Sequence, residues 1–382
     1  MTYNRYRRLP VGIQSFKVIR EENYLYVDKS DIVWNMVNLG DKYNYLSRPR
    51  RFGKSVLVDT LESYLEGRKD LFEGLKIMQM EKDWKHYPVI RLDMSRGGAN
   101  EETLRSYLNL RFKDYEEKYN ITPDPTAMLA DRFHAIIVTA YKQTGLRVAV
   151  LIDEYDSPLQ HSWRTPEHEK CTGVYREVFA ILKADDEYEH FVFITGITKF
   201  TQLSLFSVLN NLSNISFTPE YAAICGITEE EIEENFMPEI RQMSEANNWS
   251  VQETHDRLKA YYDGYHFSRR NMVDVYNPYS LVNALKSKEI INFWASSGAT
   301  SLLPKFVDNA ELRMKSFENC RIMRNTLELS DVSGGGAELF LYQSGYLTIK
   351  ESDEFGYILG FPNEEVKQAL YEYYGEDLTA GR

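Results

Sequence analysis

The stretch Tyr43–Ser55 reads YNYLSRPRRFGKS: a short aromatic and apolar run, then a basic loop, then Gly-Lys-Ser. The run predicts a strand over Tyr43–Ser47, and the apolar spacing after it predicts a helix from Gly53 to about Glu66. A loop between a strand and a helix presents main-chain N–H groups and a helix N-terminus to an anion. The segment therefore predicts a phosphate-binding loop.

Two residues of this loop carry its expected chemistry. In the pattern G-x-x-x-x-G-K-[ST] the lysine reaches the β- and γ-phosphates and the hydroxyl ligates Mg²⁺, which assigns these roles to Lys54 and Ser55. The chain departs from the pattern because Arg48 stands at the first glycine. Pro49 restricts the loop further, which leaves fewer conformations to lose on binding. The alternative is a basic turn capped by Gly53.

The other loop residues complete the expected nucleotide site. Arg48, Arg50 and Arg51 place positive charge where the charge of a nucleotide concentrates; alternatively, two of them bind Asp or Glu of a second domain. We expect the following residues to contact the nucleotide: Arg48, Pro49, Arg50, Arg51, Phe52, Gly53, Lys54, Ser55 and Val56.

A second motif lies at Val148–Glu154, VAVLIDE, an apolar strand that ends in two carboxylates. In phosphate-loop enzymes the Asp at such a strand end holds Mg²⁺, usually through water, and the next Glu polarises the attacking water. This assigns the metal to Asp153 with Ser55, and catalysis to Glu154 with Lys54. The stretch between the motifs has room for an additional strand at Pro88–Asp93, as in the subclass with a catalytic glutamate. The alternative is a strand that ends in solvated acids.

Weaker signals follow the strand predicted at Phe191–Thr195. Thr195 is placed to hydrogen-bond the γ-phosphate or its water, or it is simply a β-branched residue at a strand end. Asp156 either pairs with a loop arginine or serves as a turn residue. Either one of Arg269 and Arg270 senses the nucleotide from the helical region, or the two are a pair of solvated side chains.

The order of elements predicts the fold class. Strands spaced by helices imply a parallel sheet with right-handed crossovers, hence an α/β P-loop NTPase domain over residues 1–225. A helical, lid-like domain is expected over 226–330; it opens with a capping box at Thr228 and contains no strand up to about residue 288. A small α+β tail follows over 331–382.

Within that tail we expect a glycine hinge at 334–336, hairpin material from Leu339 onward and a last helix over Glu364–Tyr374.

Composition narrows the function classes. The chain has 45 Lys and Arg against 57 Asp and Glu, which gives a net charge of −12. This overall charge gives no support to nucleic-acid binding. A local basic groove is the alternative that the overall charge does not exclude. Three scattered cysteines indicate neither a disulfide framework nor a zinc cluster. No apolar run suits a membrane span or a signal peptide. We expect a cytoplasmic protein without membrane contact.

Several segments together resemble the bacterial AAA-ATPase-like family, over nearly the whole chain. They are Leu9–Phe16, Tyr26–Ser30, Ser47–Ser55, Leu151–Pro158, Thr195–Lys199, Tyr262–Phe267, Tyr276–Ser280, Ser344–Ile349 and Phe361–Val366. The string RPRRFGKS is specific to that family, so the resemblance makes the arginine at position 48 its usual form.

The resemblance implies ATP and Mg²⁺ as cofactors, with adenine preferred over guanine, and the same roles for Lys54, Ser55, Asp153 and Glu154. Members commonly continue into a C-terminal restriction-endonuclease-like nuclease domain, which we expect to be absent here, through truncation or because this is a short member. The N-terminal stretch Leu9–Lys29 is placed to pack beside the base, with Tyr26 or Phe16 against the adenine; alternatively, both rings belong to the core.

The expected function is a Mg²⁺-dependent ATPase that couples nucleotide state to movement of the helical domain. One alternative is a nucleotide-dependent switch or scaffold with negligible turnover, acting on a protein partner or a nuclease module. The other is the ATPase module of a nucleic-acid-processing system.

Overall fold

The structure is a computed structural model of the chain and describes residues 8–124, 126–200, 211–270, 273–296, 303–307, 317–330 and 336–374. In this part of the chain a five-stranded parallel sheet has the order β2-β3-β4-β1-β5. Its strands are β1 (Tyr43–Ser47), β2 (Val89–Asp93), β3 (Val148–Asp153), β4 (Glu189–Gly196) and β5 (Ser213–Asn214). The predicted α/β P-loop fold is confirmed.

The additional strand predicted at Pro88–Asp93 is present as β2, at the sheet edge outside β3. It is β4 that separates β1 from β3, with Thr195 opposite Leu46 and Ile194 opposite Ile152. Strand spacing in the sequence does not determine strand order, because each crossover leaves a choice of neighbour.

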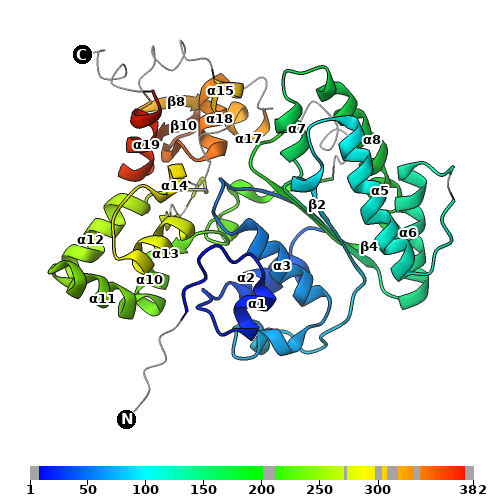
Figure 1. Cartoon of the computed structure of the whole chain (residues 1–382), viewed down its shortest axis with the longest axis horizontal. Helices are drawn as coiled ribbons and strands as arrows, with labels where there is room; N and C mark the ends of the chain where they lie inside the picture. Colours follow the sequence, from blue (N-terminus) through cyan, green and yellow to red (C-terminus); the bar gives the residue numbers. More distant parts are fainter. Residues whose placement is uncertain are drawn as a thin grey trace.

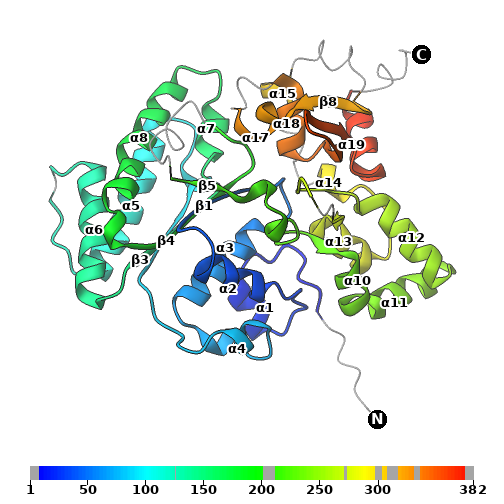
Figure 2. The ribbon, with the colours of Figure 1, turned by 180° about the vertical axis from the view of Figure 1, so that it is seen from behind.

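Helices cover both faces of the sheet, as right-handed crossovers require. On one face lie α1 (Phe16–Glu21), α2 (Ser30–Asn38) and α3 (Lys54–Leu65); on the other lie α5 (Glu101–Lys118), α6 (Leu129–Thr144) and α8 (Glu167–Ala184) (Figures 1 and 2). Shorter elements are η1 (Lys69–Phe72), α4 (Ile77–Met80), η2 (Met94–Arg96), α7 (Ser157–Ser162), η3 (Asp186–Tyr188), η4 (Ile215–Phe217) and η5 (Pro219–Tyr221). Because both faces are covered, every residue of β3 is buried.

The second region is mostly helical. It contains β6 (Ile227–Thr228), α10 (Glu229–Asn235), α11 (Met237–Asn247), α12 (Val251–Tyr262), β7 (Val275–Tyr276), α13 (Pro278–Ser287) and α14 (Phe293–Ser296). The Thr228 capping box is present. The expectation of no strand is wrong, because β6 and β7 pair antiparallel. Two-residue strands give almost no period-2 pattern, so the sequence could not reveal them.

This region has a hydrophobic core of its own, separate from the core around the central sheet. Leu25 of the N-terminal segment packs into it, whereas Phe16 packs into the core of the sheet. The N-terminal segment therefore contributes to both cores. The domain boundaries at 225 and 330 stay a prediction.

The C-terminal region lies beside α12–α14 (Figure 1). It contains α15 (Leu303–Phe306), β8 (Cys320–Met323), α17 (Arg324–Leu329), α18 (Gly336–Ser344), β9 (Thr348–Ser352), β10 (Gly356–Gly360) and α19 (Glu364–Tyr374). The predicted last helix is present. The predicted hinge lies outside the described residues except for Gly336.

The hairpin predicted from Leu339 begins later. Residues Leu339–Ser344 belong to the helix α18, and the hairpin is β9–β10, with β8 paired on its other side. Every residue of Leu339–Ser344 is buried. A short apolar run that is buried all round has no periodicity by which a helix and a strand can be told apart.

Candidate functional site

The loop after β1 has the geometry of a phosphate cradle. Gly53 has φ +84° and caps α3, which begins at Lys54. This left-handed conformation is open to glycine without strain, which explains the glycine of the motif. Arg51 also has positive φ, +69°. The first residues of this twelve-residue helix therefore line the cavity beside the loop, where a helix N-terminus favours an anion.

The first two loop residues do not face the cavity that the rest of the loop lines. Arg48 is 1% exposed, and its guanidinium donates to the carbonyls of Ser47 (2.8 Å), Ser216 (2.9 Å) and Tyr221 (2.9 Å). Burial lowers the pKa of Arg48. The Arg48 side chain is therefore held by protein carbonyls, away from the concavity.

The middle of the loop contacts the helical region. Arg50, Arg51 and Phe52 line the cavity. The guanidinium of Arg51 lies 4.8 Å from the ring centre of Tyr279 on α13. This is a cation–π contact with the helical region. A carboxylate partner for two of the loop arginines stays a prediction.

Lys54 is buried and its ammonium donates to the carbonyls of Arg48 and Pro49, both at 2.9 Å. Burial lowers its pKa, and the nearby carboxylates Glu154, Asp153 and Asp156 oppose that effect. Lys54 thus lies inside the loop, close enough to the acidic residues at the end of β3 and just after it for their negative charge to stabilise its ammonium.

The two sequence motifs meet at Ser55. Burial raises the pKa of the Asp153 carboxylate, and the Ser55 hydroxyl lies close enough to that carboxylate to oppose the rise. Asp153 Oδ1 accepts from the Glu154 amide at 2.9 Å. Glu154 has φ +48° and lines the cavity, and burial raises its pKa while Lys54 opposes the rise. The structure brings Lys54, Ser55, Asp153 and Glu154 together.

The donor set suits Mg²⁺, a hard cation that takes oxygen ligands and keeps several of its waters. Ser55 and Asp153 offer a hydroxyl and a carboxylate oxygen beside the loop. Among the described residues no group of three or more His, Cys, Asp or Glu side chains is arranged to hold a metal by itself. A magnesium site here would be of the kind that shares its ion with phosphate oxygens.

Thr195 and Asp156 hold the end of β4. The Thr195 hydroxyl donates to the Leu46 carbonyl at 2.8 Å, and Thr195 does not line the cavity. Asp156 Oδ2 accepts from the amides of Ile197 (3.0 Å) and Thr198 (2.6 Å) and from the Thr198 hydroxyl (2.6 Å). Asp156 lies in the turn before Pro158, as one of the two suggestions had it, and its side chain also fixes the turn after β4.

A cavity of about 440 Å³ adjoins the loop. One group of lining residues, here called the loop wall, comprises Arg50–Leu57, Thr60 and Glu154. The other group, here called the apolar wall, comprises Val11, Ile13, Leu25, Ile227, Phe236 and Val282. Three residues of the apolar wall belong to the N-terminal stretch Leu9–Lys29, which the sequence suggested beside the base. Sequence reasoning missed the three from the helical region, although the nearby family-like segment Tyr276–Ser280 also carries residues that line the cavity.

Of the two rings suggested for adenine, Tyr26 lines the cavity and Phe16 does not. Phe16 is fully buried and packs edge-on against Tyr26 at 5.0 Å between ring centres. Burial raises the pKa of Tyr26, and the neighbouring Thr60 hydroxyl opposes the rise. Phe16 is thus a core residue that supports Tyr26.

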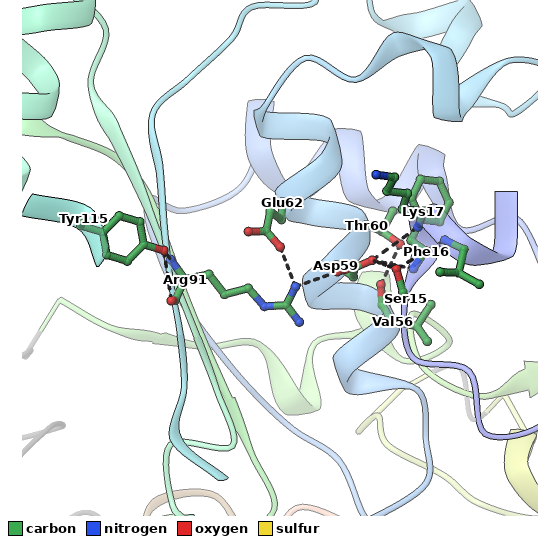
Figure 3. A network of polar contacts seen from close by, with 10 residues as sticks. Ser15, Phe16, Lys17, Val56, Asp59, Thr60, Glu62, Arg91 and Tyr115 are labelled. Atoms are coloured by element: carbon green, nitrogen blue, oxygen red, sulfur yellow. Dashed lines mark hydrogen bonds and ion pairs between the residues drawn. The ribbon is translucent and has the colours of Figure 1, made fainter. Parts of the chain in front are cut away.

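A polar network joins the N-terminal segment to the phosphate-loop helix (Figure 3). Asp59 on α3 accepts from the Phe16 amide (2.6 Å) and the Ser15 hydroxyl (3.1 Å) at the start of α1. Arg91 on β2 donates to Asp59 (2.7 Å) and Glu62 (2.5 Å). These contacts hold α1 and the adjoining cavity-lining segment in register with α3.

Arg269 lies elsewhere: its Nε is 3.2 Å from Glu328 on α17. Neither Arg269 nor Arg270 lines the cavity. In the described part of the chain, no helix has both the length and the apolar character needed to cross a bilayer.

Comparisons with known proteins show the family to which the chain belongs. A family described as Predicted AAA-ATPase matches residues 10–206. An uncharacterized protein in the vnfD 5′ region of Azotobacter chroococcum mcd 1 is 32% identical over 375 residues, which are 96% of this chain and 69% of the relative.

Two solved structures show a distant likeness. A Walker-type ATPase of Pyrococcus abyssi is 13% identical with a TM-score of 0.45 over 92% of this chain and 97% of the other. Cdc6p of Pyrobaculum aerophilum is 11% identical with a TM-score of 0.27 over 92% of each chain. Both are too remote to carry a functional argument. The family match spans half of the chain and the Azotobacter relative spans almost all of it, so this protein belongs to the AAA-ATPase-like family.

Proposed function

We propose that the protein is a Mg²⁺-dependent ATPase. The observation that supports this most strongly is the proximity of Lys54 and Ser55, at the start of α3, to Asp153 and Glu154, at the end of β3. It joins a loop suited to phosphate with a strand end that carries two carboxylates, although the motifs are far apart in the sequence. Phosphoryl transfer needs mainly positioning and neutralisation of charge, and these groups supply both.

Each residue has a role in this proposal. Lys54 exchanges its two carbonyl acceptors for phosphate oxygens, and the main-chain amides of residues 52–55 hold the phosphate chain. Ser55 and Asp153 hold Mg²⁺, which neutralises phosphate charge when bound. Glu154 orients and polarises the attacking water; its raised pKa lies closer to neutrality than that of a free glutamate, which suits a base.

We also propose that nucleotide state is coupled to the helical region. Arg51 contacts Tyr279 on α13 at 4.8 Å, and the Phe52 ring packs edge-on against Tyr265 (4.7 Å) and Phe267 (5.3 Å). A change in the loop on binding phosphate would have to move these rings. Closure of this kind, by one packed body moving against another, is a common response to ligand.

Two substitutions test the proposal by separating binding from turnover. Lys54→Ala is expected to abolish ATP binding in calorimetry, whereas Glu154→Gln keeps the ATP affinity and loses multiple-turnover phosphate release. Lys113→Ala on the exposed face of α5 is the matched lysine control and leaves both unchanged. Equal ATP affinity in wild type and Lys54→Ala would refute the proposal.

The same assay decides between the ATPase and a nucleotide-dependent switch. Steady phosphate release by wild type, above the background of Glu154→Gln, rejects the switch. Tight ATP binding without release would favour it, with the partner then being a protein or a nuclease module. A role with nucleic acid stays an expectation from the family resemblance, because nothing in the charge of the chain supports it.

A further inference from the structure

The phosphate loop rests on the C-terminal region. Gly345, the residue after α18, has φ +91°, and a Cβ placed there would lie 2.7 Å from Cβ and 3.0 Å from Cγ of Pro49. Real Cβ atoms do not approach other carbon atoms so closely, so the contact requires glycine at position 345. Pro49 is the second residue of the loop and one of the two carbonyl acceptors of Lys54.

Arg48 anchors the same part of the loop from the other side. Its guanidinium joins the loop to η4 and η5 through Ser216 and Tyr221, and it lies 4.3 Å from the ring centre of Phe267. Phe217, next to Ser216, stacks on Tyr342 of α18 with 5.9 Å between ring centres. The Arg48 carbonyl is the other acceptor of Lys54. Arg48 thus connects the resting position of Lys54 with α18.

The loop after β4 contacts the same helices. Lys199 donates its ammonium to the Glu328 carbonyl on α17 (2.9 Å) and its amide to Gln343 on α18 (3.3 Å). Strands β1 and β4 are neighbours in the sheet; the loop after β1 packs against the end of α18, and the loop after β4 contacts both α17 and α18.

We propose that Arg48 and Gly345 are positioning residues which set the shape of the phosphate loop, so that nucleotide affinity responds to the placement of the C-terminal region. This inference rests on the proposed function. It explains the arginine that replaces the first glycine of the motif, because the Arg48 side chain holds the loop from behind and does not bind phosphate.

Gly345→Ala tests the contact with Pro49. Its matched control is Gly145→Ala at the end of α6, where φ is +70° and nothing lies within 4 Å of the added Cβ. Both variants incur backbone strain, but only Gly345→Ala displaces Pro49. We expect Gly345→Ala to weaken ATP and ADP binding by about tenfold, which corresponds to about 1.4 kcal/mol, and Gly145→Ala to stay within about twofold of wild type.

Arg48→Met and Arg48→Lys form a second, independent test if Gly345→Ala does not fold. Loss of positioning weakens ATP and ADP by the same factor, because both use the β-phosphate part of the loop. Lysine at position 48 gives little rescue, because one ammonium cannot reproduce a fork that reaches three carbonyls. A loss confined to ATP, or near-complete rescue by lysine, would identify a direct phosphate ligand and overturn the inference.

The outcomes separate the two proposals. If wild type binds neither ATP nor ADP in calorimetry, the proposed function itself fails. If wild type binds both, while Gly345→Ala matches Gly145→Ala and Arg48→Met matches wild type, the function stands and the positioning role is refuted.

Discussion

The loop wall and the apolar wall of the cavity are built in opposite ways. The loop wall comes mainly from one contiguous segment, Arg50–Leu57, and is rich in charge and in main-chain amides. The apolar wall takes its residues from three distant parts of the chain: the N-terminal segment, the β6–α10 region and α13. One contiguous loop can supply all the groups of a phosphate site, whereas an apolar surface needs side chains from several segments packed together.

The difference also appears in how each wall is held. The loop is fixed by hydrogen bonds to main-chain carbonyls, from Arg48 and Lys54. The apolar wall depends on packing in the second core and on the buried ion pair between Lys29 and Glu231. Changes in the two walls should therefore affect different measurements.

The largest expected effect concerns the assembled wall. Lys29 Nζ lies 2.5 and 2.6 Å from the two carboxylate oxygens of Glu231, and both side chains are largely buried. Lys29→Met leaves a buried carboxylate without its cation, and we expect it to lower the free energy of unfolding by about 3–5 kcal/mol. Urea denaturation measures the change.

The control is Lys113→Met, whose partner Glu117 is 3.8 Å away at the surface. Exposed pairs contribute little, so a loss below about 1 kcal/mol is expected there. Similar losses in the two variants would show that the Lys29–Glu231 pair does not hold the assembled wall.

The next prediction has an intermediate size and distinguishes binding of the nucleobase from binding of the phosphates. Val282→Thr keeps the side-chain shape but adds a hydroxyl to the apolar wall, which must be desolvated when a base covers it. We expect ATP to bind about fivefold more weakly, a cost of about 1 kcal/mol, and inorganic tripolyphosphate to bind as before. Isothermal calorimetry with both ligands measures this. Equal losses of affinity for ATP and for tripolyphosphate would mean that the apolar wall does not bind the nucleobase.

The smallest effect is in the pH dependence, and it belongs to the loop wall alone. The pKa of Glu154 is raised above 4.5, so its carboxylate is protonated, and stops acting as a general base, as pH falls through that raised value. The pKa of Lys54 is lowered below 10.5, so its charge is lost as pH rises through that lowered value. Turnover should fall on both sides of neutrality, the acid limb with a midpoint above 4.5 and the alkaline limb with one below 10.5.

Val282→Thr should leave both midpoints of this profile in place, because it alters no charged group. Glu154→Gln supplies the background rate. An acid midpoint at the ordinary glutamate value would argue against Glu154 as the base.

Much of the site could be predicted because its rules are local. A strand, a loop with glycine before lysine, and a helix need only short-range backbone preferences, and β1 and α3 lie where the sequence placed them. The Asp153–Glu154 pair was likewise evident from the strand that precedes it. The capping box at Thr228 is of the same kind, since both of its hydrogen bonds span three residues.

What the sequence determined by itself is thus the cradle and the acidic strand end, because each follows from neighbouring residues. Tertiary structure alone decided that β4 lies between β1 and β3, that the Arg48 guanidinium turns to main-chain carbonyls, and that three distant segments form the apolar wall. It also decided that Leu339–Ser344 is a helix. The physical reason is that hydrophobic burial is non-directional. The sequence indicates that an apolar side chain will be buried or that a cationic one will be paired, but the partner depends on the tertiary structure.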